Sequence, residues 1–424
     1  MNKFIVLDIN HGGDYLAAIL QSRGYEVIIY DIYQTNDEKR QELNKKNIGI
    51  IDSVDTEYKE YTVVYPAHCP DHFLSSFSKN KKVTHHELVK FLFDGKNNVI
   101  EITGSKGKTT TAHVLAHLLS FEDNVILNSS TGLEAILNGR SKLIDENNSI
   151  SPGYTAKILF QENSNFYVLE ESLGVSGTGN ISILTSMDPV YTIKGGKGNS
   201  LEAKKNLFEL SERNIIIDGK DKIATNLVEK YQKEVFRIWE DVRIEIPDYL
   251  EIGKDIYSNI YFKDLELQTK FSGKYLLAGY ANSILFGSMA LKILNRDLRK
   301  IPANLSTFNG VENRMSVVNE TSYTRIIDKS GGFTEDSLRY LLSLLKRNYD
   351  MFYKKINLLI DLNNVSHCQK IDIYALDRVI GEFGNLVDNA FLTGNHDFER
   401  FKYLKNSTEL NIEKGDLLIE CGKW

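Results

Sequence analysis

Short apolar runs alternate with amphipathic stretches along almost the whole chain. Residues 3–33 (KFIVLDINHGGDYLAAILQSRGYEVIIYDIY) have the pattern of a buried strand, a glycine turn, a helix and a second strand. Strands that are apolar on both faces are typical of parallel sheets covered by helices. The pattern therefore predicts an α/β fold that opens with a Rossmann-like unit. The turn reads HGG rather than Gly-x-Gly-x-x-Gly, so nothing in it requires a dinucleotide.

The pattern continues through three segments, for which we predict boundaries near residues 95 and 298. Thr84 and Thr334 each precede an amphipathic stretch and are good helix N-caps. The elements that the pattern predicts beyond residue 33 are strands at 61–69, 166–170, 180–186, 214–219, 260–268, 355–362 and 389–394, and helices at 84–93, 282–294, 334–348 and 372–383.

The composition narrows the class of protein. A chain of 424 residues is too long for one hydrophobic core, and 42% hydrophobic with 25% charged residues is typical of soluble globular proteins. The net charge of -6 and the lack of a basic cluster argue against a nucleic-acid partner. No apolar run approaches the ~20 residues that span a membrane. Asp8 interrupts the apolar N-terminus, and the three cysteines are far apart, so we expect a cytoplasmic protein.

Residues 101–119 (EITGSKGKTTTAHVLAHLL) have the pattern of a strand, a glycine turn and a helix. A helix that begins after such a turn presents free N–H groups and a partial positive charge, which suit a phosphate. Lys108 would add a full charge for the β- and γ-phosphates, and the Thr109 hydroxyl would bind Mg²⁺. The alternative is a plain strand-to-helix turn with a solvated lysine. The predicted nucleotide-binding residues are Gly104, Ser105, Lys106, Gly107, Lys108, Thr109 and Thr110.

Phosphoryl transfer also requires carboxylates that hold Mg²⁺. The apolar run FYVLE ends in Glu170, which would reach the same crevice if its strand lies beside the phosphate strand. We therefore predict Glu170 as a metal ligand; an ordinary surface acid is the alternative. His113 and His117 lie four residues apart on the predicted helix and could share a metal, although contacts with neighbouring elements are the simpler interpretation.

The Gly-x-x-Gly-Lys-Thr-Thr turn, about 100 residues into the chain and behind a small Rossmann-like domain, resembles the Mur ligase superfamily. The resemblance covers nearly the whole sequence. It implies a three-domain architecture, with a Rossmann-like substrate-binding domain (1–95), a central P-loop ATPase domain (96–298) and a Rossmann-like C-terminal lid (299–424). It also implies a ligase that uses ATP and Mg²⁺ to phosphorylate a carboxylate, after which a nucleophile displaces phosphate from the acyl phosphate.

Further motifs extend this resemblance. LLAGYANSILFGSMA matches the family segment whose asparagine contacts the nucleotide, here Asn282, although Ala281 replaces the usual histidine. TFNGVENRMSVV and IIDKSGG resemble the segments that bring an arginine and an aspartate to ATP, here Arg314 and Asp328. The strand ending in Glu170 matches the one that carries the Mg²⁺-binding glutamate of the family.

The family also has a lysine that CO₂ carbamylates and whose new carboxylate holds a second Mg²⁺. The matching segment is LEAKKNL, which implies Lys204, with Lys205 as the neighbouring possibility and a solvated lysine as the alternative. The resemblance thus implies Lys108, Glu170 and Lys204 as the catalytic set. The usual Asn-x-x-x-Asp-His segment reads TSMDPVYT here and contains no histidine, so the ligands of the second metal are open.

The N-terminal segment must select the carboxylate substrate. We predict His11, Gly12, Gly13 and His68 as substrate-binding residues, because both of their loops follow strands of the Rossmann-like unit. VLDINHGG, YDIY, YPAHCP and EESLGVSGTGN are most similar to a methanogen branch of the superfamily, which activates a propionate of a nickel tetrapyrrole and closes a ring. The alternatives are a murein or pseudomurein peptide ligase and, from another class, a non-catalytic nucleotide-binding regulatory protein.

Overall fold

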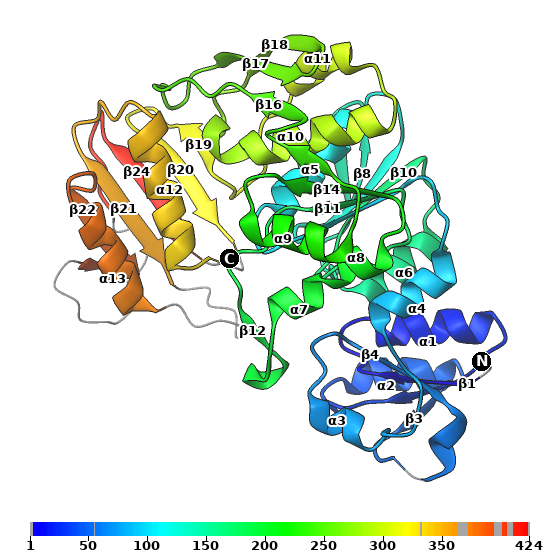
Figure 1. The fold of residues 1–424 in the computed structure, drawn as a ribbon. Helices are drawn as coiled ribbons and strands as arrows, with labels where there is room; N and C mark the ends of the chain where they lie inside the picture. Colours follow the sequence, from blue (N-terminus) through cyan, green and yellow to red (C-terminus); the bar gives the residue numbers. More distant parts are fainter. Residues whose placement is uncertain are drawn as a thin grey trace. The chain divides into compact units, whose positions relative to one another are not determined.

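The computed structural model describes residues 3–54, 56–330, 333–362, 372–393, 401–404 and 410–422. These residues fall into two compact units, one of residues 1–242 with 282–298 and one of residues 243–281 with 299–424. The fold is mixed α/β with several parallel sheets (Figure 1), as the pattern predicts. Among the described residues, no helix is both long enough and apolar enough to cross a membrane.

The N-terminal residues form a parallel five-stranded sheet with the order β3-β2-β1-β4-β5. The chain runs outward from β1 in one direction and then returns to add β4 on its other side, so β1 and β4 flank the switch point of a doubly wound sheet. The elements are β1 (Lys3–Leu7), α1 (Gly13–Ser22), β2 (Glu26–Tyr30), α2 (Asp37–Lys45), β3 (Gly49–Ile51), β4 (Thr62–Tyr65), α3 (Asp71–Ser75), β5 (Lys82–Thr84) and α4 (His85–Phe93).

The same unit contains the central sheet, in which β15-β14-β11-β6-β10-β7 are consecutive parallel neighbours and β8 and β9 add antiparallel strands. All parallel strands therefore end at one edge of this sheet. The elements are β6 (Val99–Thr103), α5 (Lys108–Leu119), β7 (Val125–Ser129), β8 (Gly132–Leu137), β9 (Arg140–Asp145), α6 (Pro152–Gln161), β10 (Phe166–Glu170), β11 (Ile181–Leu184), β12 (Thr192–Ile193), β13 (Gly198–Asn199), α7 (Ser200–Lys204), α8 (Asn206–Leu210), β14 (Asn214–Asp218), α9 (Lys222–Tyr231), β15 (Phe236–Ile238), β16 (Val242–Ile244) and α10 (Leu277–Ile293), which continues from the second unit into the first.

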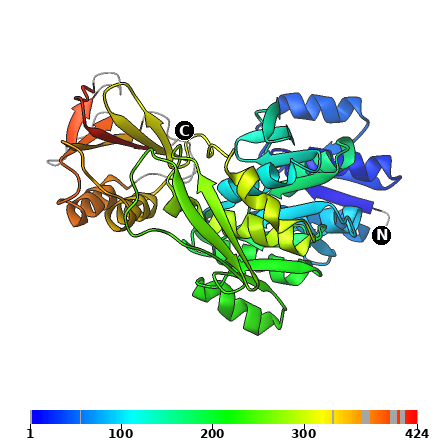
Figure 2. The same ribbon diagram turned by 90° about the horizontal axis from the view of Figure 1, so that it is seen from above.

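The second unit has a six-stranded sheet, β19-β20-β24-β21-β22-β23, and Figure 2 shows its two longer helices together on one side of the strands. A single strand predicted over 260–268 is wrong, because the chain turns at Lys263 and Asp264 into an antiparallel hairpin. The elements are β17 (Ile256–Phe262), β18 (Leu265–Phe271), α11 (Ile301–Leu305), β19 (Ser316–Asn319), β20 (Thr324–Lys329), α12 (Glu335–Asn348), β21 (Ile356–Asp361), α13 (Ile373–Glu382), β22 (Asn389–Thr393), β23 (Phe401–Leu404) and β24 (Leu417–Gly422).

The predicted helix starts are confirmed by hydrogen bonds. The Thr84 Oγ1 accepts the N–H of Glu87 at 3.2 Å in a full capping box. Thr334 precedes α12, and the leucines that share one face of this helix are fully buried. The predicted domain boundaries near residues 95 and 298 stay predictions.

Helices α1 and α4 of the N-terminal sheet pack on α6 of the central region. Two glycines make the contact between α1 and α6 possible, since a Cβ on Gly12 would lie 2.8 Å from the Cα of Gly153. Next to them the Ser151 hydroxyl donates to the carbonyl of His11 at 2.8 Å. The loop that carries His11 is therefore held against the central region by direct backbone contact.

We expect Gly12→Ala to lower the midpoint of thermal unfolding more than Gly24→Ala does. Both glycines have a positive φ, 88° and 82°, and share the strain of about 1–2 kcal/mol that a Cβ adds there. Only Gly12 adds a backbone clash, worth roughly 1–3 kcal/mol more, because a Cβ on Gly24 meets nothing within 4 Å. Equal shifts in calorimetry would contradict the close contact.

Candidate functional site

The turn between β6 and α5 is shaped by two glycines and by the end of β11. Gly104 has a φ of 146°, and a Cβ there would lie 2.1 Å from the Thr185 Oγ1. The N–H of Ser105 donates to the Ser186 carbonyl at 2.8 Å, and the N–H of Lys106 donates to the Ser186 Oγ at 2.9 Å. Strand β11 thus fixes the turn from the side, so the turn depends on residues some 80 positions further along the chain as well as on its own glycines.

The residues predicted to bind phosphate and metal lie together at the end of β6 and β10. The Thr109 hydroxyl donates to the Glu170 Oε2 at 2.9 Å, and the N–H of Ser130 donates to the same oxygen at 3.0 Å. The Lys108 Nζ lies 3.1 Å from the Gly104 carbonyl and 3.8 Å from the Glu170 Oε1. Glu170 is only 2% exposed, so it is not an ordinary surface acid. Thr110 follows on α5 and is half-buried.

Lys204 ends α7 with its side chain fully buried. Its Nζ donates to the Ser105 Oγ at 2.5 Å and lies 4.8 Å from the centre of the Tyr191 ring. Burial, with a further contribution from the charge of Lys108, lowers the pKa of Lys204 from 10.5 to about 7. The neighbouring Lys205 instead forms a surface ion pair with Glu202. The structure therefore separates the two lysines: only Lys204 reaches the nucleotide turn.

Asn282 lies on α10 and meets the carboxyl ends of two further strands. Its amide nitrogen donates to the Asp218 Oδ2 at 2.8 Å, and its carbonyl oxygen accepts the indole N–H of Trp239 at 2.8 Å. The Lys220 Nζ lies 3.3 Å from the centre of the Trp239 ring. Asn282 is thus at the same edge of the central sheet as Lys108. The motifs of the sequence contain no signal for the contribution of Trp239.

Arg314 and Asp328 belong to the second unit and lie near one another in it. An Nη1 of Arg314 donates to the Lys329 carbonyl at 2.5 Å. The N–H of Met315, the next residue, donates to the Asp328 Oδ1 at 3.3 Å. Both side chains are therefore held by backbone groups, one at the end of β20 and one just before β19. Their predicted contacts with ATP stay predictions.

Two buried carboxylates behind the site were not predicted. Glu171 points to the opposite side of β10 from Glu170 and is fully buried, as is Glu101 on the neighbouring β6. Burial raises the pKa of Glu171 well above its usual range, and the charge of Glu101 raises it further. The Thr178 hydroxyl donates to Glu101 at 3.0 Å. Glu101 was visible in the sequence as a lone charge inside the apolar run NVIEIT.

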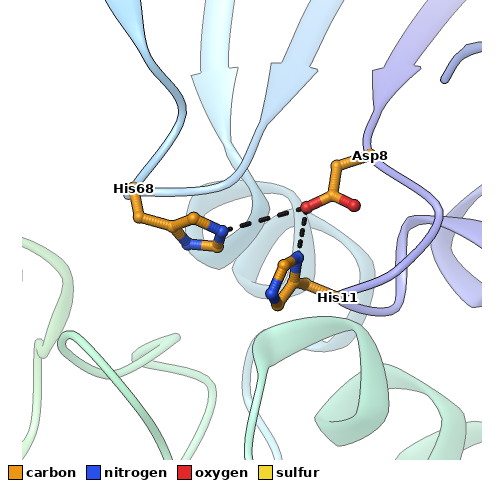
Figure 3. Close-up of side chains that lie close together, drawn as sticks. All are labelled: Asp8, His11 and His68. Atoms are coloured by element: carbon orange, nitrogen blue, oxygen red, sulfur yellow. Dashed lines mark hydrogen bonds and ion pairs between the residues drawn. The ribbon is translucent and has the colours of Figure 1, made fainter. Parts of the chain in front are cut away.

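The predicted substrate residues His11 and His68 meet in the N-terminal sheet, beside the buried Asp8 (Figure 3). His11 hydrogen-bonds to the Asp8 carboxylate through Nδ1. The two histidines border a cavity of about 70 Å³ between the N-terminal sheet and the central region. The cavity is lined by His11, Pro66, Ala67, His68, His85, His86, Ser149, Ser151, Pro152, Ser172 and Leu173. Burial lowers the pKa of His68 to about 4 and that of His85 to about 3, so both are neutral near pH 7.

His11, Gly12 and Gly13 follow β1, and the glycines are needed for the contact of α1 with α6 and with the Asp8 carbonyl.

The other histidine pair does not share a site. The His113 Nε2 lies 3.0 Å from the Thr131 hydroxyl, whereas the His117 ring packs edge-on against Phe121. Contacts with neighbouring elements therefore account for both.

Comparison with known proteins shows what this chain is similar to. Residues 102–241 match the model of the Mur ligase middle domain. The chain is 26% identical to a coenzyme F(430) synthetase of Methanosarcina acetivorans, over 92% of this chain and 90% of the relative, and 24% identical to one of Methanocaldococcus jannaschii, over 98% and 97%. The crystal structure of the MurF ligase from Thermotoga maritima in complex with ADP shares the fold, with a TM-score of 0.62 at 13% identity over 93% of this chain and 91% of that one.

The chain is thus similar to the Mur ligases over almost its whole length, and its residues 102–241 match their middle domain. It is therefore an ATP-dependent, ADP-forming ligase of the Mur type. The predicted three-domain Mur-ligase-like fold class is confirmed by the fold that the chain shares with the MurF ligase. The roles of the individual site residues stay predictions, as does the identity of the carboxylate.

We expect Lys204→Met to stabilise the protein at pH 7 while it abolishes ATP turnover. The pKa of Lys204 lies near 7 in the folded protein and near 10.5 in the unfolded chain. Folding at neutral pH must therefore either remove a proton from the amine or bury its charge, and both lower the free energy of unfolding. Removing the amine would raise the free energy of unfolding by about 2–4 kcal/mol at pH 7, and the gain would fade as the pH rises toward 10. Calorimetry at both pH values measures this.

The neighbouring variant Lys205→Met is the control for that experiment. The Lys205 amine is paired with the exposed Glu202, so the unfolding midpoint should change little at either pH. A loss of stability at pH 7 in Lys204→Met would contradict the buried, neutral amine.

Proposed function

We propose that this ligase activates a carboxylate of a nickel-containing reduced tetrapyrrole and closes a carbocyclic ring on it, as a coenzyme F430 synthetase. The observation that carries the proposal is similarity over more than nine-tenths of the chain to two proteins of that name. The substrate would be the seco acid, whose propionate side chain accepts the γ-phosphoryl group. A carbon of the same molecule would then attack the acyl carbon, lose its proton and release phosphate.

The nucleotide turn supplies the charge that this first step requires. A carboxylate and a triphosphate are both anions, and the Lys108 ammonium beside the N–H groups of α5 would neutralise the terminal phosphates. Glu170 and Thr109 fit Mg²⁺ as ligands, because a carboxylate oxygen and a hydroxyl converge within 2.9 Å in a buried position. Mg²⁺ bound there would withdraw charge from the phosphate oxygens. ADP leaves as the oxygen of the substrate bonds to phosphorus.

Lys204 is proposed to carry the carbamate that the family uses. The neutral amine attacks CO₂, an N–C bond forms and one proton leaves, so a pKa near 7 makes the amine reactive at neutral pH. Its Nζ contacts the Ser105 hydroxyl of the nucleotide turn, so a carboxylate on it would face the phosphates. The carbamate would then supply a metal ligand in place of the histidine that the segment TSMDPVYT lacks.

Asn282, Arg314 and Asp328 are proposed nucleotide contacts. Asn282 stands at the same sheet edge as the phosphate turn, beside Trp239. Arg314 and Asp328 would reach ATP when the C-terminal domain closes as a lid. Closure would keep water from the acyl phosphate, which otherwise hydrolyses.

The substrate assay separates the candidate functions. Purified protein would be incubated with ATP and Mg²⁺, and then with either the seco acid or a panel of amino acids plus nucleotide-linked precursors. We expect ADP release and a changed tetrapyrrole absorption spectrum with the seco acid alone, and a hydroxamate when hydroxylamine traps the acyl phosphate. ADP release that requires an amino acid would instead favour a peptide ligase.

Two variants make the assay decisive. Lys108→Ala should reduce turnover by about 10³-fold or more, since it removes the mobile charge at the phosphates. Lys142→Ala, on the exposed β9 of the same unit, should leave it unchanged. No ADP release from the wild type with any carboxylate would favour the non-catalytic regulatory protein.

Carbamylation has its own spectroscopic test. With ¹³C-labelled bicarbonate, we expect a carbamate signal in the ¹³C spectrum of the wild type and of Lys205→Ala, but not of Lys204→Ala. ATP turnover should be retained in the proteins that show the signal and lost in Lys204→Ala. The signal should weaken below pH 7, because at pH 6 only about a tenth of an amine with this pKa is neutral. Equal signals in both variants would refute the assignment to Lys204.

A further inference from the structure

The switch point of the N-terminal sheet brings together residues from two loops. Asp8 follows β1 directly, and His11 stands in the same loop before α1. His68 follows β4, which pairs with β1 through Ile5 and Val63. In doubly wound sheets the carboxyl ends of such strands form the place where ligands bind. The three side chains converge there on one point (Figure 3).

The donor atoms lie close enough together to converge on one ion, for which the His11 Nδ1 would exchange its hydrogen bond to Asp8. The Asp8 Oδ2, the His11 Nδ1 and one ring nitrogen of His68 all lie within 4.8 Å of one another. The His68 Nε2 is 3.9 Å from the Asp8 Oδ2. It is buried and has no hydrogen-bond partner among the residues that the structure describes. This ring nitrogen points at a carboxylate that is too far away for a hydrogen bond. A cation between the two groups would give both of them a partner.

The surroundings hold the carboxylate in place. Asp8 is fully buried and has a left-handed backbone with a φ of 74°, and its second oxygen accepts the N–H of Asn10 at 2.8 Å. His85 lies nearby and is fixed by its Nε2, 3.1 Å from the Leu7 carbonyl. Ligands of a metal are commonly oriented by such outer contacts.

We propose that Asp8, His11 and His68 bind a divalent first-row transition metal ion, separate from the Mg²⁺ of the nucleotide site. Two imidazoles and a carboxylate are a ligand set for Zn²⁺ or Ni²⁺, with a fourth position left for water or for a group of the substrate. His11 and His68 line the cavity between the N-terminal sheet and the central region, as do the hydroxyl-bearing Ser149 and Ser151, so a fourth ligand could enter from there.

The cavity beside the three side chains has room for an ion. Its volume of about 70 Å³ holds an ion together with one or two waters. A nickel ion within a tetrapyrrole also exposes only one free coordination position on each face of the ring. Three donors that converge from one side therefore match an ion that is not inside a macrocycle.

The test measures metal binding directly, with the full chain and without substrate. Protein freed of metal by chelation would be titrated with Zn²⁺ in the absence of nucleotide, and Co²⁺ would report the ligand geometry by its visible absorption. We expect one ion per chain for the wild type and binding at least about 100-fold weaker for His68→Asn and His11→Gln, since loss of an outer contact alone costs about 10–100-fold. Both side chains are partly exposed, so both variants should fold.

The controls separate this site from the nucleotide site. His72→Asn, on the surface of α3, should bind the ion like the wild type, and so should Lys108→Ala. His68→Asn should still bind an ATP analogue, which shows that it is folded. Lack of binding to the wild type, or equal binding by His68→Asn and His72→Asn, would overturn the proposal. It would also be overturned if Zn²⁺ never binds and only the seco acid shows a His68-dependent spectral shift, since the nickel would then belong to the substrate.

Discussion

A charged side chain that leaves water must find hydrogen bonds or an opposite charge, and this requirement organises the carboxyl edge of the central sheet. Glu170 lies at the centre of this edge. One oxygen of its buried carboxylate accepts from Thr109 on α5 and from Ser130 after β7, and the other faces Lys108. A strand, a helix start and a second loop are thus held by one negative charge. The same carboxylate is then in place to meet the cation that a triphosphate brings with it.

The segment after β11 shows how the departure from the family motif is accommodated. TSMDPVYT lacks the expected histidine, yet it supports the nucleotide turn throughout. The Ser105 hydroxyl lies within hydrogen-bond distance of the carbonyls of Met187, at 2.9 Å, and Pro189, at 2.8 Å. Tyr191 at its end covers the amine of Lys204. Burial and the charge of Lys108 together lower the pKa of this amine, so its charge is easily lost, which is the condition for its reaction with CO₂.

The fold was largely predictable because buried parallel strands have no polar face and their helices have one. The hairpin of β17 and β18 was not, since its turn at Lys263 and Asp264 contains neither glycine nor proline and its strands read as one run. The buried pair of Glu101 and Glu171 was also missed. Glu101 stood out as a lone charge inside an apolar run, but Glu171 after the end of β10 looks the same in sequence whether it faces solvent or the interior, and the two are brought together by the pairing of β6 with β10.

By itself the sequence determined the presence of the nucleotide turn and the class of fold. Contiguous residues from Gly104 to Thr110 encode a glycine turn and a helix start, and periodicity encodes strands and helices, although the segment after β11 completes the turn. Only the tertiary structure decided which side chains share a site. Lys204 contacts Ser105 of the nucleotide turn whereas its neighbour Lys205 pairs with Glu202, and His68 lies near Asp8 because β4 lies beside β1. Strand order and burial arise from packing between distant parts of the chain, and no local pattern of residues specifies them.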